Sequence, residues 1–440
     1  MPRHRVKLIF KQALPIVGGL VLQNIMGLID LMMVAHLGNA AIAAVGISAF
    51  AGFLCVAFLV GLSSSVQAVA SRREGEGSGS QTAIPLNGGL ILSLAIGLPL
   101  TVLAYCLVPP LFPLLNSAPE VIQRGIPYLR IHLLSLVGMG MGFAFRGYWN
   151  GTNRSVVYLK SIVVTNLINI GISYVLIFGK AGFPEMGTTG AALGTTISTY
   201  IGLGYSMWLG LSLSRENGFL RRLPSLASMR TLLRLTTPSG MQRAFHALGF
   251  NLLFMMVGKL GIREVACTHV LINLLSMATL PGMGFGMAAG SFVGQELGRH
   301  KLYEAKKWGW DTVKIALCTL VLIGLPMIFT PKTLLSLFIH QKETLALATR
   351  PLQIVGVFMS FEALGLIMMN TLLVAGDAHR VFMINAGLQW LLFLPAAYLV
   401  GLKLGFGLLG IWIALMSYRG IQSIIYSLLW HGEKWGTIRI

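Results

Sequence analysis

Residues 32–38 have the sequence MMVAHLG, and residues 255–261 have the sequence MMVGKLG. A shift of 223 residues superposes these two segments without a gap. The same shift aligns three further pairs: Pro15 with Pro238, Gly61 with Gly284, and Gly75 with Gly298. Isolated glycine matches are common in a chain with 52 glycines, but a clustered match is not. The two halves of the chain therefore resemble each other, and the expected fold contains an internal repeat.

The composition is that of a membrane protein. Of the 440 residues, 55% are hydrophobic and 11% are charged, whereas about 25% are charged in an average soluble domain. The net charge of +19 could attract nucleic acid, but the charges lie in short loops between apolar runs, so we expect no nucleic-acid partner. The four cysteines all lie in apolar stretches: Cys55, Cys106, Cys267 and Cys318. Because they lack metal-ligand spacing, we expect no metal site and no bound cofactor.

Long apolar runs indicate how the chain crosses the bilayer. A spanning helix needs about 20 mostly apolar residues. The runs are continuous and lack the alternation of barrel strands. We therefore predict an all-α polytopic membrane protein with 12 transmembrane helices. The predicted spans are 13–35, 45–70, 86–108, 127–148, 157–178, 189–212, 232–258, 265–292, 310–330, 352–373, 382–402 and 408–430.

Positive charge predicts the orientation, because Lys and Arg accumulate in cytoplasmic loops. With 12 spans, both termini lie on one side of the membrane. That side and its loops carry more than twice as many Lys and Arg residues as the opposite loops. We therefore expect a multi-pass protein of the bacterial inner membrane, with both termini in the cytoplasm.

The longest basic loop, residues 213–231, lies at the middle of the chain. We interpret it as a cytoplasmic linker between an N-terminal six-helix lobe (1–212) and a C-terminal six-helix lobe (232–440). Six is an even number, so both lobes enter the membrane in the same sense. This is a parallel repeat about an axis along the membrane normal, a pattern seen in secondary transporters, whose binding sites lie near the midplane.

Asp30 is the strongest candidate for a functional residue. It is one of three aspartates in the chain and the only one in the interior of a predicted span. A mid-helix Asp costs about 2.5–3.5 kcal/mol on insertion scales, so it should face a cavity or a partner. Burial favours the neutral form of a carboxyl group. A carboxylate that holds either a proton or a cationic compound, but not both, is a minimal antiport device.

Other polar side chains also lie inside predicted spans. Asn166 and Asn169 could bond Asp30 across the N-terminal lobe, or form ordinary bonds between helices. Ser173 lies one turn further along the same span. We expect these three residues to form a neutral network that supports Asp30.

The C-terminal half has its own intramembrane charges. Glu362 lies in the tenth predicted span, and Arg243 and His246 share a face of the seventh because they are three residues apart. We expect an ion pair between Glu362 and Arg243 that locks the lobe. The alternative is a second proton or cation site.

Three motifs, in this order and spacing, resemble the multidrug and toxic compound extrusion (MATE) family over nearly the whole chain. They are DxxMVxxLG at 30–38, preceded by Pro15; NxxN at 166–169, which runs on to LIFG at 176–179 and GAA at 190–192; and VGQxxG at 293–298. The resemblance implies a V-shaped pair of six-helix lobes with a central cavity. It implies export of organic, mostly cationic or amphipathic compounds, driven by inward H+ or Na+. It also implies that the helix of Pro15 bends when its carboxyl group is protonated.

At the positions that distinguish the proton-coupled branch of the family from the Na+-coupled branch, the sequence matches neither branch completely. Ser173 stands where the proton-coupled, DinF-type branch often has a second carboxylate. His246 stands where the Na+-coupled branch has a carboxylate, whereas Glu362 matches the second C-terminal carboxylate of that branch. A Na+ site needs several oxygen ligands, but a proton needs one titratable group.

We therefore predict a monomeric antiporter, closest to the DinF-type branch, that exports drugs in exchange for H+ through Asp30. The first alternative is the same fold coupled to Na+. The second is a lipid-linked oligosaccharide flippase, which should have several cavity cations where this chain offers Arg243 and Arg419. A passive channel is disfavoured because rings of charge or carbonyl filters are absent from the sequence. An enzyme is not expected, because the sequence has no Walker motif or catalytic triad.

Overall fold

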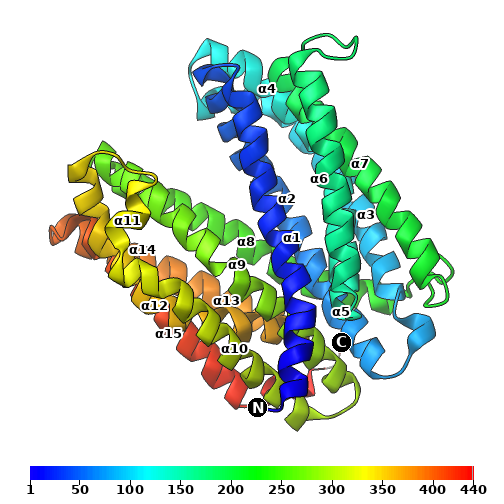
Figure 1. The fold of residues 1–440 in the computed structure, drawn as a ribbon. Helices are drawn as coiled ribbons and strands as arrows, with labels where there is room; N and C mark the ends of the chain where they lie inside the picture. The colour runs from blue at the N-terminus through cyan, green and yellow to red at the C-terminus, as the bar shows by residue number, and fades with distance from the viewer. Residues whose placement is uncertain (439) are drawn as a thin grey trace. The chain divides into compact units, whose positions relative to one another are not determined.

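The computed structural model describes residues 1–438 and 440, and within them the regular secondary structure is entirely helical (Figure 1). The elements in chain order are α1 (Arg3–Ala35), α2 (Asn39–Gly75), η1 (Gly79–Gln81), α3 (Ile84–Leu115), α4 (Pro119–Leu133), α5 (Leu136–Gly151), α6 (Ser155–Phe178), α7 (Gly187–Ser214), α8 (Leu226–Gly258), α9 (Ile262–Gly298), α10 (Leu302–Phe329), α11 (Pro331–Ser336), α12 (Lys342–Ala375), α13 (Ala378–Gly387), η2 (Leu388–Phe393), α14 (Leu394–Ala397), η3 (Tyr398–Lys403), α15 (Gly407–His431) and η4 (Lys434–Thr437).

The number of helices suited to crossing a membrane is smaller than predicted. By length and composition, nine helices of the described chain qualify, or ten if α4 and α5, bent by 47° at their junction, count as one span. The predicted spans fall largely on helix, with 127–148 crossing the turn between α4 and α5, but α7 and α8 are less apolar than the other long helices. Threonine, serine and glycine lower the hydropathy of α7, and the segment of α8 around Arg243 and His246 is polar. The prediction of 12 spans is therefore supported only for nine or ten.

The repeated motif ends at a helix-to-helix turn in both halves. Gly38, between α1 and α2, has a φ of 94°, and Gly261, between α8 and α9, has a φ of 153°. Only glycine adopts such angles without strain. The match between 32–38 and 255–261 thus reflects one tight connection that is used twice.

The chain forms two compact units whose limits cut through helices. One unit contains Gly18–Gly240, and the other contains Met1–Val17 together with Met241–Ile440. The first turns of α1 thus belong to the unit built from the C-terminal half, and the first turns of α8 belong to the unit built from the N-terminal half. The shift of 223 residues that aligns Pro15 with Pro238 also maps one limit onto the other.

We call the first turns of α1 and of α8 the exchanged helix ends, because each belongs to the unit built mainly from the other half of the chain. Two equivalent glycines explain how these ends are held. A methyl group on Gly61 of α2 would lie 2.6 Å from the Thr236 carbonyl oxygen of α8. A methyl group on Gly284 of α9 would lie 3.1 Å from the Val17 nitrogen of α1. Only a hydrogen atom fits between these backbones. In each unit, therefore, a glycine of the second helix of the half receives the exchanged helix end.

The predicted linker, 213–231, is part of the unit Gly18–Gly240 and is anchored to it. The Asn87 side chain of α3 donates to the carbonyl oxygens of Gly218 and Arg222, both at 2.9 Å, and accepts a bond from the Leu220 N–H. Phe219 is fully buried and packs on Phe145 of α5. The chain therefore passes between the units within α1 and α8, and not at this loop.

Candidate functional site

Asp30 lies near the C-terminal end of α1, in the portion of the helix that belongs to the unit Gly18–Gly240. Its side chain is half-buried. No described residue donates a hydrogen bond to its carboxylate or forms an ion pair with it. The phenol of Tyr128, on α4, lies close enough to interact with Asp30 electrostatically. Asp30 is therefore a carboxyl group that no described side chain neutralises.

An apolar cluster surrounds this end of α1. Its buried members come from five helices and are Val34, Ala41, Val45, Tyr128, Ile177, Ala191 and Ala192. Met33 and Leu37, both from the repeated motif, pack against it. The apolar residues that follow Asp30 thus fix this end of α1 against α2, α4, α6 and α7, while the carboxylate stays partly accessible.

Tyr128 and His132 were not predicted from the sequence to accompany Asp30. The two rings stack on α4 with centroids 6.0 Å apart and an angle of 12° between their planes. His132 is half-buried, and its buried Nδ1 has no hydrogen-bond partner among the described residues. A single tyrosine in an apolar helix carries no signal in the sequence, so only the packing of α4 beside α1 reveals it.

The predicted network on α6 forms, but it does not reach Asp30. The Asn169 amide donates to Ser198 of α7 at 3.0 Å, and Ser173 donates to the Asn169 side-chain oxygen at 3.2 Å. Asn166 donates to the Leu22 carbonyl oxygen of α1 at 3.2 Å. The expected amide bonds to Asp30 are thus replaced by bonds that hold α6 against α7 and α1.

Pro15 lies inside α1, which runs unbroken from Arg3 to Ala35. The proline precedes by two residues the limit at Val17, where α1 passes from one unit to the other. A proline removes one backbone bond and allows a local bend. The role of Pro15 as the site of a bend stays a prediction.

In the C-terminal half, the partner of Glu362 differs from the predicted one. Arg419 of α15 binds the Glu362 carboxylate in a bidentate manner, with Nε at 2.6 Å and a terminal nitrogen at 2.9 Å. The Glu362 side chain is only 4% exposed. The prediction of Arg243 as this partner was wrong, because the packing of α15 on α12 brings in a residue 57 positions later.

Arg243 and His246 lie one turn apart on α8, near a polar segment of the eleventh predicted span. Gln389, in the π-helical segment η2, donates to the His246 carbonyl oxygen at 3.1 Å. Gln422 of α15 bonds Asn385 of α13. π-Helical segments are rare and frequently occur at functional sites. The C-terminal half thus contains a bonded polar interior in which the carboxylate is already neutralised.

Within residues 1–438 and 440, no three or more His, Cys, Asp or Glu side chains are grouped to hold a metal ion. Neither Asp30 nor Glu362 belongs to such a group. Glu362 is bound by a guanidinium, and no described residue forms an ion pair with Asp30.

Apolar helices with a repeat and an isolated intramembrane carboxyl group define the class of polytopic membrane transporters. The family model described as MatE matches residues 15–175 and 238–399, one match in each half. The chain belongs to this family of transporters, and it is not an enzyme.

Relatives along the full length agree with this assignment. The chain is 26% identical to the "Probable multidrug resistance protein NorM" of Thermotoga maritima over 99% of this chain and 94% of that protein. It is 25% identical to the protein of the same name in Pseudomonas aeruginosa, over 99% and 90%. These relatives carry the name NorM, so they do not support the predicted closeness to the DinF-type branch.

Solved structures share the fold. An outward-facing multidrug resistance MATE family transporter matches with a TM-score of 0.89 and 19% identity, over 98% of this chain and 97% of that one. MATE structures described as bent and as straight also match, each with a TM-score of 0.89 and 19% identity, over 97% of this chain and 95% and 96% of theirs, respectively.

Proposed function

We propose that this protein is a secondary antiporter that exports organic cationic or amphipathic drugs in exchange for H+, with Asp30 as the coupling residue. One observation carries the proposal: Asp30 is a half-buried carboxyl group in a membrane helix that no described residue neutralises. The names of the relatives, which describe multidrug resistance proteins, support the choice of cargo.

The chemistry of one unpaired carboxyl group suffices for exchange. When Asp30 is ionised, its negative charge attracts an organic cation. When Asp30 takes up a proton from outside, that attraction is lost and the cation leaves. Because the site cannot hold the proton and the cation together, inward proton flow drives outward drug flow.

Glu362 is a weaker candidate for coupling. Both of its oxygens accept bonds from Arg419, so a proton or a cation would have to displace a buried guanidinium. This pairing also weakens the flippase alternative, because the positive charge of Arg419 is compensated and less available to an anionic headgroup.

The choice of H+ over Na+ rests on the number of oxygen ligands. A hard cation in a protein site takes several oxygen ligands, whereas the structure records one further oxygen group, the Tyr128 phenol, in electrostatic interaction with Asp30. The Ser173 hydroxyl donates to the Asn169 side-chain oxygen, and the Asn169 amide nitrogen donates to Ser198 of α7. This arrangement favours the proton, as in the DinF-type branch, although the named relatives are NorM proteins.

The decisive experiment measures ethidium uptake into inverted membrane vesicles. We expect uptake with an imposed pH gradient in Na+-free buffer and no uptake with a Na+ gradient at uniform pH. Uptake should fall when the vesicle lumen, which corresponds to the cell exterior, is alkaline. Dependence on Na+ with indifference to the pH gradient would replace this proposal with the Na+ alternative.

The matching variant is Asp30→Asn, which preserves shape but cannot titrate. We expect it to insert and fold normally while uptake falls to background. Asp377→Asn, in the turn between α12 and α13, is the control and should transport normally. Near-wild-type uptake by Asp30→Asn would exclude Asp30 as the coupling residue.

The proposal includes a monomeric protein in the bacterial inner membrane, with both termini in the cytoplasm. The basic loops and the bacterial relatives support this placement. Labelling of single cysteines introduced at residue 2 and at residue 433 with a membrane-impermeant reagent tests it. Both should react in inverted vesicles and stay unreacted in intact cells.

A further inference from the structure

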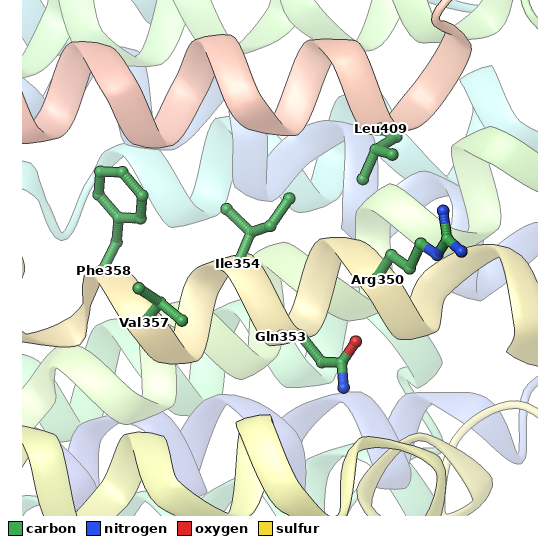
Figure 2. Close-up of a pocket in the computed structure, with 6 residues that line it drawn as sticks. All are labelled: Arg350, Gln353, Ile354, Val357, Phe358 and Leu409. Atoms are coloured by element: carbon green, nitrogen blue, oxygen red, sulfur yellow. The ribbon is translucent and has the colours of Figure 1, made fainter.

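A groove runs between α12 and α15, inside the unit that contains Met241–Ile440. Its volume is about 360 Å³, and its lining residues are Arg350, Gln353, Ile354, Val357, Phe358 and Leu409. Figure 2 shows Ile354 and Phe358 pointing from α12 toward α15, Leu409 pointing back from α15, and Arg350 at one end. The groove is large enough for part of a small amphiphile, because ligand pockets begin at about 300 Å³.

Arg350 is an exposed cation without a partner in the described chain. It lies two residues before the predicted apolar run 352–373, so the predicted span places it at the membrane surface, on the side opposite the termini. A second exposed arginine, Arg263, belongs to the same end of the unit, because it pairs with Glu343 in the first turn of α12. Of these two arginines, only Arg350 borders the groove and keeps its charge uncompensated.

The rest of the groove is apolar and follows the helix away from Arg350. Ile354 lies about one turn from Arg350, and Phe358 about two turns, which is about 12 Å along the axis. Val357 is 57% exposed, so the wall is open to its surroundings. Gln353 is held by a bond to the Ile328 carbonyl oxygen of α10 and fixes that side of α12.

We propose that this groove binds an anionic phospholipid, with its phosphate at Arg350 and an acyl chain along Ile354, Phe358 and Leu409. Charge and shape both point to this occupant. A cation at the membrane surface attracts an anionic headgroup, and an apolar wall within the bilayer suits an acyl chain. An organic cation, the cargo proposed above, would be repelled by Arg350. The inference therefore stands or falls independently of the transport proposal.

Native mass spectrometry of the full-length protein with phosphatidylglycerol tests the proposal. A single contact between an arginine and a phosphate at a water-exposed site contributes about fivefold in affinity. We expect Arg350→Gln to bind phosphatidylglycerol about fivefold more weakly, and Arg263→Gln, the matched control, to bind like the wild type. Equal losses in both variants, or none in Arg350→Gln, would overturn the site.

Two further measurements separate a lipid from a free anion. Leu409→Trp fills the apolar wall and keeps Arg350, so we expect it to lose phosphatidylglycerol binding as well. Inorganic phosphate at millimolar concentration should not displace the lipid. If Leu409→Trp binds normally, or if phosphate competes fully, Arg350 is an anion site without an acyl groove. If phosphatidylcholine binds as tightly as phosphatidylglycerol, the site does not select anionic lipid. Either result would contradict the proposal.

Discussion

At the scale of single residues, the two intramembrane carboxylates differ in whether a cation pairs with them: Arg419 pairs with Glu362, and no described residue pairs with Asp30. Both are recognisable from the sequence, because an acidic residue within an apolar run is costly unless it is satisfied. Their partners are not recognisable. Arg419 meets Glu362 only because α15 packs on α12, and Tyr128 meets Asp30 only because α4 lies beside α1. The sequence therefore identifies each charge, and the structure shows which side chains surround it.

The pairing of Glu362 with Arg419 makes a quantitative prediction. Removing one partner of a buried ion pair costs about 3–5 kcal/mol, whereas removing both can be nearly neutral. Glu362→Gln and Arg419→Gln should each lower the thermal midpoint in detergent, and the double variant should recover much of the loss. Arg243→Gln combined with Glu362→Gln is the control and should give no recovery. Additive losses for Glu362 and Arg419 would argue against the pair.

At the scale of helices, the close approach of two backbones explains why glycine occurs at equivalent positions in the two halves. The glycine alignment, Gly61 with Gly284, is visible in the sequence, and so is the turn at Gly38 and Gly261. What each glycine contacts is not visible, because the partner is the exchanged end of a helix far away in the chain. The predicted spans 189–212 and 232–258 do lie within α7 and α8, but the polar residues of these helices keep them from qualifying as membrane spans by composition.

Gly61→Ala tests this close approach. Its methyl group would meet the Thr236 carbonyl oxygen at 2.6 Å and the Gly240 nitrogen at 2.9 Å. Overpacking of this kind costs about 1–3 kcal/mol, so we expect a lower thermal midpoint. Gly46→Ala, on the same helix but with open space around the added methyl group, should be neutral or slightly stabilising, because alanine favours helix. Equal thermal midpoints for the two variants would show that α8 shifts to accept the methyl group without a loss of stability.

At the scale of the whole molecule, α1 links the two units and carries Asp30. Its first turns are held in one unit by Arg5, which donates to Asp311 at 2.8 Å, also pairs with Glu304, and lies 4.5 Å from the centroid of the Trp308 ring. Its later turns, with Asp30, belong to the other unit. The helix that carries Asp30 thus begins in the unit to which Asp30 does not belong. The sequence suggests two halves, but it gives no sign that they exchange helix ends.

Because Arg5 anchors the first turns of α1, we expect the variant Arg5→Gln to loosen them. Hydrogen bonds to charged groups contribute about 1.5–3 kcal/mol each, so the amides of residues 3–17 should exchange hydrogen faster in this variant. If α1 transmits the change at Asp30, pH-driven ethidium uptake should slow while equilibrium ethidium binding stays the same, because Asp30 and its surroundings are untouched. Lys7→Gln, an exposed charge on the same turns, is the control and should alter neither. Faster hydrogen exchange with undiminished transport would show that transport does not depend on the contacts that Arg5 makes at the beginning of α1.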